Sequence, residues 1–324
     1  MTSPVTPSPE PAPKSGPNPG PWGSVATLST RQITGLSVGV AVLLIALKAF
    51  ALGASGSVSI LASLADSSLD LIASLTTFYA VRWAAAPADA DHRYGHGKGE
   101  AMAALVQAGL VFASAVFIGW EALHRMFDPR PVTGGPWATG VIVISILLTG
   151  LLVWLQTRSL RASGSLAVSA DRAHYAADLA SSGVVLIGVA SGAWLAAPGL
   201  DAAAGLVVAV WLFWGAFGLL KGAGDQLLDR EASDADRIAL TNAVLSDTRV
   251  GGVHQLRTRM SGNRIIAQMH VDLDRTLSFE AAHDIVAAAE DRVKAAFPGA
   301  DVLIHADPRG PTAPSVPVTA SPLA

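Results

Sequence analysis

Long apolar runs alternate with short polar segments over the first two thirds of the chain. Residues 32–81 hold only three charged side chains, Lys48, Asp66 and Asp70, and a Gly/Ser-rich break divides them at residues 53–57. Since a helix needs about 20 apolar residues to cross a bilayer, the pattern predicts six transmembrane helices. The remaining uncharged runs cover residues 101–120, 137–157, 179–197 and 202–220, and the helical pattern of the third of these extends backward to residue 165.

The Lys and Arg residues of the short loops lie mostly on one side of this predicted bundle. The opposite side receives only Arg125 and Arg130. Because cytoplasmic loops carry an excess of Lys and Arg, we expect both termini to be cytoplasmic. The residues assigned to the cytoplasmic side are Lys14, Arg31, Arg82, Arg93, Lys98, Arg158, Arg161, Lys221 and Arg230.

The pattern changes after residue 231, where the apolar runs end. Residues 232–308 hold 19 charged side chains in 77 positions, close to the average of soluble domains. The order of predicted elements, αββαβ, indicates a cytoplasmic α/β domain whose sheet packs on two helices and leaves its other face free for a partner. The expected elements are a helix over residues 233–246, a β-hairpin over 253–260 and 264–272, a helix over 277–297 and a strand over 301–305.

These patterns divide the chain into five segments. Two Pro-rich tails, which we expect to be disordered, flank the folded part. The expected boundaries are residues 1–30 for the first tail, 31–223 for the six-helix membrane domain, 224–231 for a linker, 232–308 for the cytoplasmic domain and 309–324 for the second tail.

Composition supports a membrane protein and excludes several functions. Of the 324 residues, 51% are hydrophobic and only 15% are charged, and the mean hydropathy is +0.44. A formal net charge of −3 gives no broad basic field, so we expect no nucleic-acid partner. The chain has no cysteine, which excludes disulfides and thiolate metal sites.

Four ionisable residues inside the predicted spans form two matching pairs. Asp66 and Asp70 are spaced i, i+4, and His174 and Asp178 repeat that spacing, so each pair lies on one face of its helix. If the two faces meet, one imidazole and three carboxylates suit a divalent ion such as Zn²⁺. The alternative is that each residue only makes a buried hydrogen bond. We interpret Lys48 as a residue that reaches the outer interface with its ammonium group.

Two further clusters lie outside the spans. In the loop before the third predicted helix, Asp89, His92 and His96 could ligate one ion, although a solvated polar loop would have a similar composition. In the cytoplasmic domain, histidines at the ends of adjacent elements indicate a multinuclear metal site, the alternative being scattered surface histidines. That third cluster consists of His254, His270, His283, His305 and Asp307.

Several motifs together resemble the cation diffusion facilitator family, with the greatest similarity to its bacterial zinc/iron exporter branch. The resemblance covers about residues 31–308. The motifs are Gly56-Ser57-Val58-Ser59-Ile60-Leu61-Ala62 leading to Asp66-Ser67-Ser68-Leu69-Asp70, then Tyr94-Gly95-His96-Gly97-Lys98, His174-Tyr175-Ala176-Ala177-Asp178, Leu227-Leu228-Asp229-Arg230 and His305-Ala306-Asp307-Pro308.

The resemblance implies a homodimeric metal/proton antiporter in a bacterial inner membrane, with a metallochaperone-like cytoplasmic domain. It implies that Zn²⁺, Fe²⁺ or Cd²⁺ is the substrate and a regulatory ligand. It also implies that Lys98 and Asp229 form an intersubunit salt bridge. Its implied sites are a transport site at Asp66, Asp70, His174 and Asp178, a loop site at Asp89, His92 and His96, and a cytoplasmic binuclear site at His254, His270, His283, His305 and Asp307.

Other functions compete with transport by antiport. A membrane-embedded hydrolase would also use Asp and His, but the chain has no His-Glu-x-x-His motif, and its one Gly-x-Ser-x-Gly match, residues 35–39, lies inside an apolar helix. A passive metal channel and a membrane metal sensor remain open. Metal ligands must be deprotonated, so metal binding releases protons, and His174 is the expected carrier of the coupled proton because imidazole titrates near neutral pH.

Overall fold

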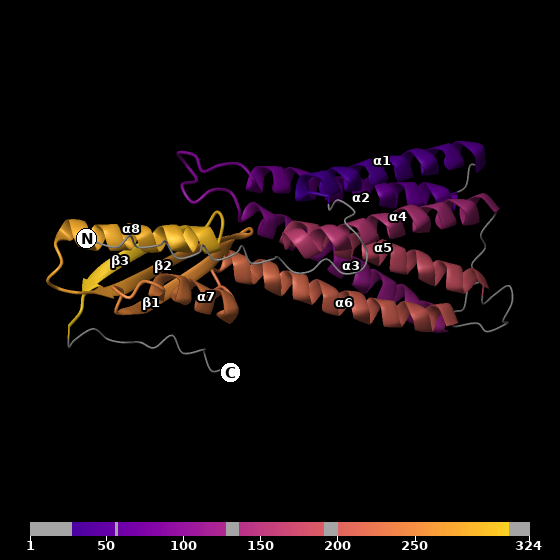
Figure 1. The fold of residues 1–324 in the computed structure, drawn as a ribbon. Helices are drawn as coiled ribbons and strands as arrows, with labels where there is room; N and C mark the ends of the chain where they lie inside the picture. The colour runs from indigo at the N-terminus through magenta and orange to yellow at the C-terminus, as the bar shows by residue number, and fades with distance from the viewer. Residues whose placement is uncertain (1–27, 56–57, 128–135, 191–199, 311–324) are drawn as a thin grey trace, which may run out of the picture.

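The computed structural model describes residues 28–55, 58–127, 136–190 and 200–310. Both Pro-rich tails lie almost wholly outside these residues, as do residues 56–57 at the end of the Gly/Ser-rich break. The expected disorder of the tails therefore stays a prediction. The described chain forms a helical bundle with a small α/β domain at one end (Figure 1).

In the described residues the bundle consists of six long helices, each of which begins within two residues of its predicted span. Helices α3, α4 and α6 end six or seven residues later than predicted. Among the described residues, α1, α3, α4 and α6 are long and apolar enough to cross a membrane. Helices α2 and α5 have a similar length but carry the acidic and histidine side chains. The bounds are α1 (Thr30–Ser55), α2 (Val58–Ala84), α3 (Gly99–Phe127), α4 (Pro136–Ser163), α5 (Leu166–Ala190) and α6 (Leu200–Leu227).

Small side chains fill the bundle while large apolar ones face outward. Ala115, Ala177 and Ala216 are buried where α3, α5 and α6 meet, whereas Trp120 and Trp214 are about two-thirds exposed. This distribution is typical of membrane helices, which approach closely through small residues and present large apolar side chains to lipid. Gly164, with φ +60°, allows the tight turn between α4 and α5, because only glycine adopts this conformation without strain.

The α/β domain consists of two helices and a three-stranded sheet of order β1-β2-β3. Strand β2 pairs antiparallel with β1 and parallel with β3, so the predicted αββαβ order is confirmed. The elements are α7 (Asp234–Leu245), β1 (Gly252–Ser261), β2 (Arg264–Leu273), α8 (Phe279–Ala296) and β3 (Asp301–Pro308). β3 is three residues longer than predicted, because it pairs with β2 until Pro308 lies beside Leu273.

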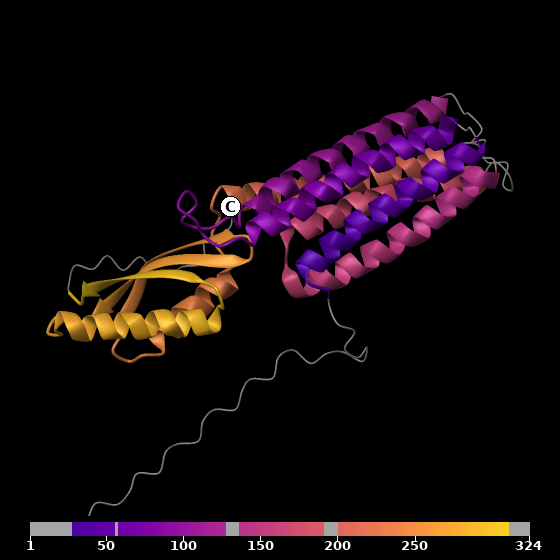
Figure 2. The same ribbon diagram turned by 90° about the horizontal axis from the view of Figure 1, so that it is seen from above.

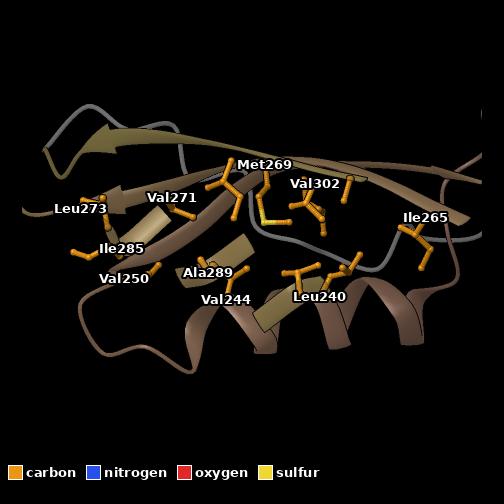
Figure 3. Close-up of a cluster of buried hydrophobic side chains, with 14 residues drawn as sticks. Leu240, Val244, Val250, Ile265, Met269, Val271, Leu273, Ile285, Ala289 and Val302 are labelled. Carbon is orange, nitrogen blue, oxygen red and sulfur yellow. The ribbon is translucent and has the colours of Figure 1, made fainter. Parts of the chain in front are cut away.

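Alternation along the strands separates the two faces of the sheet. Ala267, Met269 and Val271 of β2 are buried against Leu240, Val244 and Ala289 of α7 and α8 (Figure 3). Residues at the alternate positions lie on the opposite face, as period-2 geometry requires. The hydroxyl of Ser233 accepts a hydrogen bond from the backbone N–H of Asp236 at 3.2 Å and caps α7 where the sequence predicts its start.

The α/β domain contacts the bundle end at which α1 begins, α6 ends and the α2–α3 loop lies (Figures 1 and 2). Gln226 Nε2 of α6 donates to the carbonyl oxygen of Gly262 at 2.7 Å. The Arg259 guanidinium of β1 lies 4.7 Å from the centre of the Tyr94 ring. Gly97 has no room for a side chain, because a Cβ there would lie 2.5 Å from the Ser261 carbonyl oxygen. The β1–β2 hairpin tip is thus docked on the loop.

The apolar core under the sheet yields a stability prediction. Leu240→Ala should destabilise the α/β domain by about 2–5 kcal/mol, the cost of truncating a fully buried leucine. The measurement is hydrogen–deuterium exchange of the β2 amides in the purified protein. Ile238→Ala on the exposed face of the same helix is the control, and an equal loss of protection in both variants would contradict the assigned core.

Candidate metal sites

Helices α2 and α5 bring two carboxylates and an imidazole together inside the bundle. His174 Nε2 lies 3.1 Å from Asp70 Oδ1 and 3.8 Å from Asp178 Oδ2, and the side chains of His174 and Asp70 are buried. His174 Nδ1 and Asp178 Oδ2 have no hydrogen-bond partner among the described residues. Nitrogen and oxygen atoms within 4.8 Å of one another form a donor set that divalent ions such as Zn²⁺ accept.

Asp66 lies apart from this group. It precedes Asp70 by one helical turn on α2, its side chain is exposed, and the group of potential ligand atoms within 4.8 Å does not include it. Residues spaced i, i+4 share a face but stay about 5–6 Å apart at Cβ. The structure therefore brings three of the four predicted residues together, and metal ligation by Asp66 stays a prediction.

Lys48 does not reach the outer interface, so that interpretation is wrong. The residue is only 7% exposed. Its ammonium group donates to Ser67 Oγ at 2.6 Å and to the Ser63 carbonyl oxygen at 3.1 Å, both on α2. A buried ammonium is tolerated where hydrogen bonds and nearby carboxylates compensate for lost water, and α2 supplies both.

The structure also contains a buried carboxylate that the sequence analysis did not select. Asp171 on α5 accepts hydrogen bonds from Ser37 Oγ at 2.7 Å and from Gln156 Nε2 at 2.8 Å. Tyr175, also on α5, makes a 2.7 Å hydrogen bond with Ser74 of α2. One signal was available, because Asp171 precedes His174 by three residues and Asp178 by seven, which places all three on one helical stripe.

The loop residues Asp89, His92 and His96 also meet. Asp89 Oδ1 lies 3.3 Å from His92 Nδ1, and Asp89 Oδ2 lies 3.2 Å from His96 Nε2. The backbone N–H of His92 donates to Asp89, which lowers the pKa of that carboxyl and keeps it ionised. His96 is buried beside the Trp83 ring, whereas Asp89 and His92 are exposed. The cluster can accept a cation at the protein surface.

Three strands align the cytoplasmic cluster on the sheet face away from α7 and α8. His254 pairs with His270, which pairs with His305. His270 Nδ1 lies 2.8 Å from Asp307 Oδ2, and His254 Nε2 lies 3.4 Å from the same oxygen. The hydrogen bond from His270 lowers the pKa of Asp307. The strand register thus converts histidines distant in sequence into one cluster.

Three other residues border the cytoplasmic cluster. Asp272 Oδ1, which the sequence analysis did not select, lies 3.4 Å from His254 Nε2. His305 Nε2 lies 3.3 Å from Asp307 Oδ1. His283 comes from α8 and is outside the group of closely spaced ligand atoms, but it lines a cavity of about 330 Å³ together with His305 and Asp307. Metal ligation by the five predicted residues of this cluster, His283 and His305 included, stays a prediction.

Lys98 and Asp229 form a salt bridge within one chain. Lys98 Nζ lies 2.9 Å from Asp229 Oδ1, and Arg259 approaches the other carboxylate oxygen at 3.1 Å. The hydrogen bond from Lys98 lowers the pKa of Asp229. The pair therefore joins the α2–α3 loop to the end of α6 without a second subunit, and the intersubunit bridge stays a prediction.

Comparison with known proteins identifies both domains. Residues 35–228 match the family model described as "Cation efflux transmembrane domain", and residues 232–309 match ZT_dimer, "Cation efflux protein, cytoplasmic domain". The cation-efflux pump FieF of Shewanella oneidensis is 42% identical over 274 residues, which cover 84% of this chain and 92% of the relative. FieF of Cronobacter sakazakii is 38% identical over 269 residues, covering 83% and 89%.

Solved structures also match part of the chain. A variant of the MamM CTD in a nickel form is 26% identical with a TM-score of 0.23, covering 24% of this chain and 100% of that one. Because one family model spans more than half of the sequence and the relatives align over most of their length, the chain belongs to the cation diffusion facilitator, or cation efflux, family of integral membrane metal-ion transporters.

Proposed function

We propose that this protein exports divalent metal cations, Zn²⁺ or Fe²⁺ and also Cd²⁺, from the bacterial cytoplasm in exchange for protons. The observation that carries the proposal is the buried group of Asp70, His174 and Asp178 between α2 and α5. Ionisable groups inside a bilayer are costly and generally mark an ion pathway. Alternating access to this group from the two sides of the membrane would move the bound cation.

Proton coupling follows from the chemistry of the ligands. Carboxylates and imidazole bind a metal ion only when deprotonated, so a cation and protons compete for the same atoms. Oxygen and imidazole ligands with no thiolate favour Zn²⁺, Fe²⁺ and similar ions over Cu⁺. In this proposal, protons arriving from the outside displace the metal, and its binding from the cytoplasm releases them.

The same proposal includes six spans, cytoplasmic termini and a homodimer in the inner membrane. Arg82 and Arg161 lie in the last turns of α2 and α4, and Arg93 and Lys98 lie in the α2–α3 loop, which is at the α/β-domain end of the bundle (Figures 1 and 2). This excess of basic residues supports a cytoplasmic location for that end. The sheet face that carries the histidine cluster is not covered by α7 or α8, and Leu303 on it is 64% exposed. We assign this face to dimer contact and to regulatory metal binding, and the loop cluster to a further metal site.

The first prediction concerns the intramembrane group. Asp70→Ala and His174→Ala should each abolish Zn²⁺-dependent proton flux in proteoliposomes, because each removes a ligand and leaves the others unpaired. His124→Ala, which replaces the one histidine outside the three clusters, is the control and should retain flux. Zn²⁺-dependent proton flux in either ligand variant would contradict the assignment of the transport site. Zn²⁺ flux that does not depend on the proton gradient would favour a passive channel.

The second prediction concerns topology, and the absence of cysteine makes it directly measurable. Single cysteines would replace Ala54, Asp91 and Glu280, all of which are exposed. A membrane-impermeant maleimide added to spheroplasts should label Ala54→Cys, while Asp91→Cys and Glu280→Cys should react only after lysis. Labelling of all three in intact spheroplasts would contradict the proposed orientation.

The third prediction concerns the cytoplasmic cluster. His270→Ala and His305→Ala should lower the number of metal ions bound per chain and shift the dependence of transport rate on Zn²⁺ concentration, because metal bound there regulates the transporter. Gln268→Ala, two residues before His270 on the same strand, is the matched control. Unchanged stoichiometry and unchanged rate curves in both histidine variants would contradict a regulatory site.

A further inference from the structure

Asp171 is a fully buried carboxylate that none of the three metal sites includes. It is 0% exposed and lies on α5, three residues before His174. Its hydrogen bonds reach Ser37 of α1 and Gln156 of α4. No Lys or Arg forms an ion pair with it in the part of the chain that the structure describes. The hydrogen bonds that Asp171 accepts therefore come from neutral donors.

The donors around Asp171 need an acceptor but not a charge. Gln107 Nε2 donates to the Ala73 carbonyl oxygen at 3.0 Å and to Thr77 Oγ1 at 2.9 Å. Its nitrogen, fixed by those contacts, also lies 3.5 Å from Asp171 Oδ1. The carboxamide oxygen of an asparagine could accept the bonds from Ser37 and Gln156 equally well. Burying an ionised carboxylate instead carries a large desolvation cost.

The carboxylate lies close to the intramembrane metal group. Asp171 precedes His174 by three residues on α5, and residues with this spacing lie on one helix face with about 5–6 Å between their Cβ atoms. Charges interact strongly where water is excluded, because the energy varies inversely with the local dielectric constant. A cation held between Asp70, His174 and Asp178 would therefore be stabilised by a carboxylate that does not touch it.

We propose that Asp171 is an affinity-determining residue, whose buried negative charge strengthens cation binding at Asp70, His174 and Asp178 without ligating the ion. The inference rests on the proposed transport function. It assigns a role to the charge, whereas a purely structural role would require only the hydrogen bonds to α1 and α4.

The test separates charge from hydrogen bonding. Asp171→Asn keeps the shape and the acceptor but removes the charge, and it should raise the Zn²⁺ concentration for half-maximal transport by about tenfold or more while the maximal rate changes by less than about threefold. Ser37→Ala keeps the charge and removes one donor, so it should shift that concentration by less than about threefold. An unchanged concentration in Asp171→Asn, or equal shifts in both variants, would overturn the proposal.

Moving the charge gives a second test. Gln156 Nε2 lies 2.8 Å from Asp171 Oδ2, so the double variant Asp171→Asn/Gln156→Glu returns one carboxylate to the same cluster. It should restore half-maximal transport to within about threefold of the original concentration. If Asp171→Asn alone does not fold, the double variant carries the test. A tenfold rise in the Zn²⁺ concentration for half-maximal transport in the folded double variant would then overturn the inference.

The same assay distinguishes the two proposals. The unmodified protein and Asp70→Ala are measured alongside the Asp171 variants. If the unmodified protein carries no Zn²⁺, or Asp70→Ala carries it normally, the proposed function fails. If those two behave as expected and Asp171→Asn keeps the original half-maximal concentration, only the role of Asp171 fails.

Discussion

Charges buried in an apolar helical bundle must be compensated by the protein itself, and the arrangement of the membrane domain depends on this constraint. Water is not available to solvate them, so each ionisable group needs hydrogen bonds, a counter-charge or a bound ion. Lys48 donates to Ser63 and Ser67 of α2, and Asp171 accepts from α1 and α4. The group at His174 is left with unpaired nitrogen and oxygen atoms, as suits a site that an ion occupies only for part of a cycle.

The compensation also explains how the helices are joined. Small residues allow α3, α5 and α6 to pack closely, and hydrogen bonds between helices add to this packing in a lipid environment. Asp171 accepts hydrogen bonds from α1 and α4, and Tyr175 is hydrogen-bonded to α2, so these two residues connect α5 to three other helices. They fix the face on which His174 and Asp178 meet Asp70. The polar network and the close packing of small residues together hold these side chains in place.

The junction of the two domains is held by different interactions from those inside the bundle, because it lies where water is present. The hairpin tip of β1 and β2 docks on the α2–α3 loop through a close glycine approach at Gly97 and through the charges of Lys98, Asp229 and Arg259. The same two strands carry His254 and His270 nearer their other ends. The hairpin thus connects the neighbourhood of the loop cluster with the cytoplasmic cluster. A register shift between His254 and Arg257 allows His254 to lie beside His270 while Leu256 stays in the apolar core.

The sequence by itself determined the helices of the bundle, the αββαβ order and the candidate clusters, because apolar run length, alternation and i, i+4 spacing are local properties. Tertiary structure decided which predicted groups meet. Asp66 shares a helix face with Asp70 yet stays outside the group, and Lys48 is buried against α2. The spacing of Asp171 places it on the helical stripe of His174, but only the packing of α1 and α4 gives it Ser37 and Gln156 as partners. Spacing fixes the face of one helix or strand on which a residue lies, whereas the neighbour that this face contacts depends on the packing and register of all the other elements.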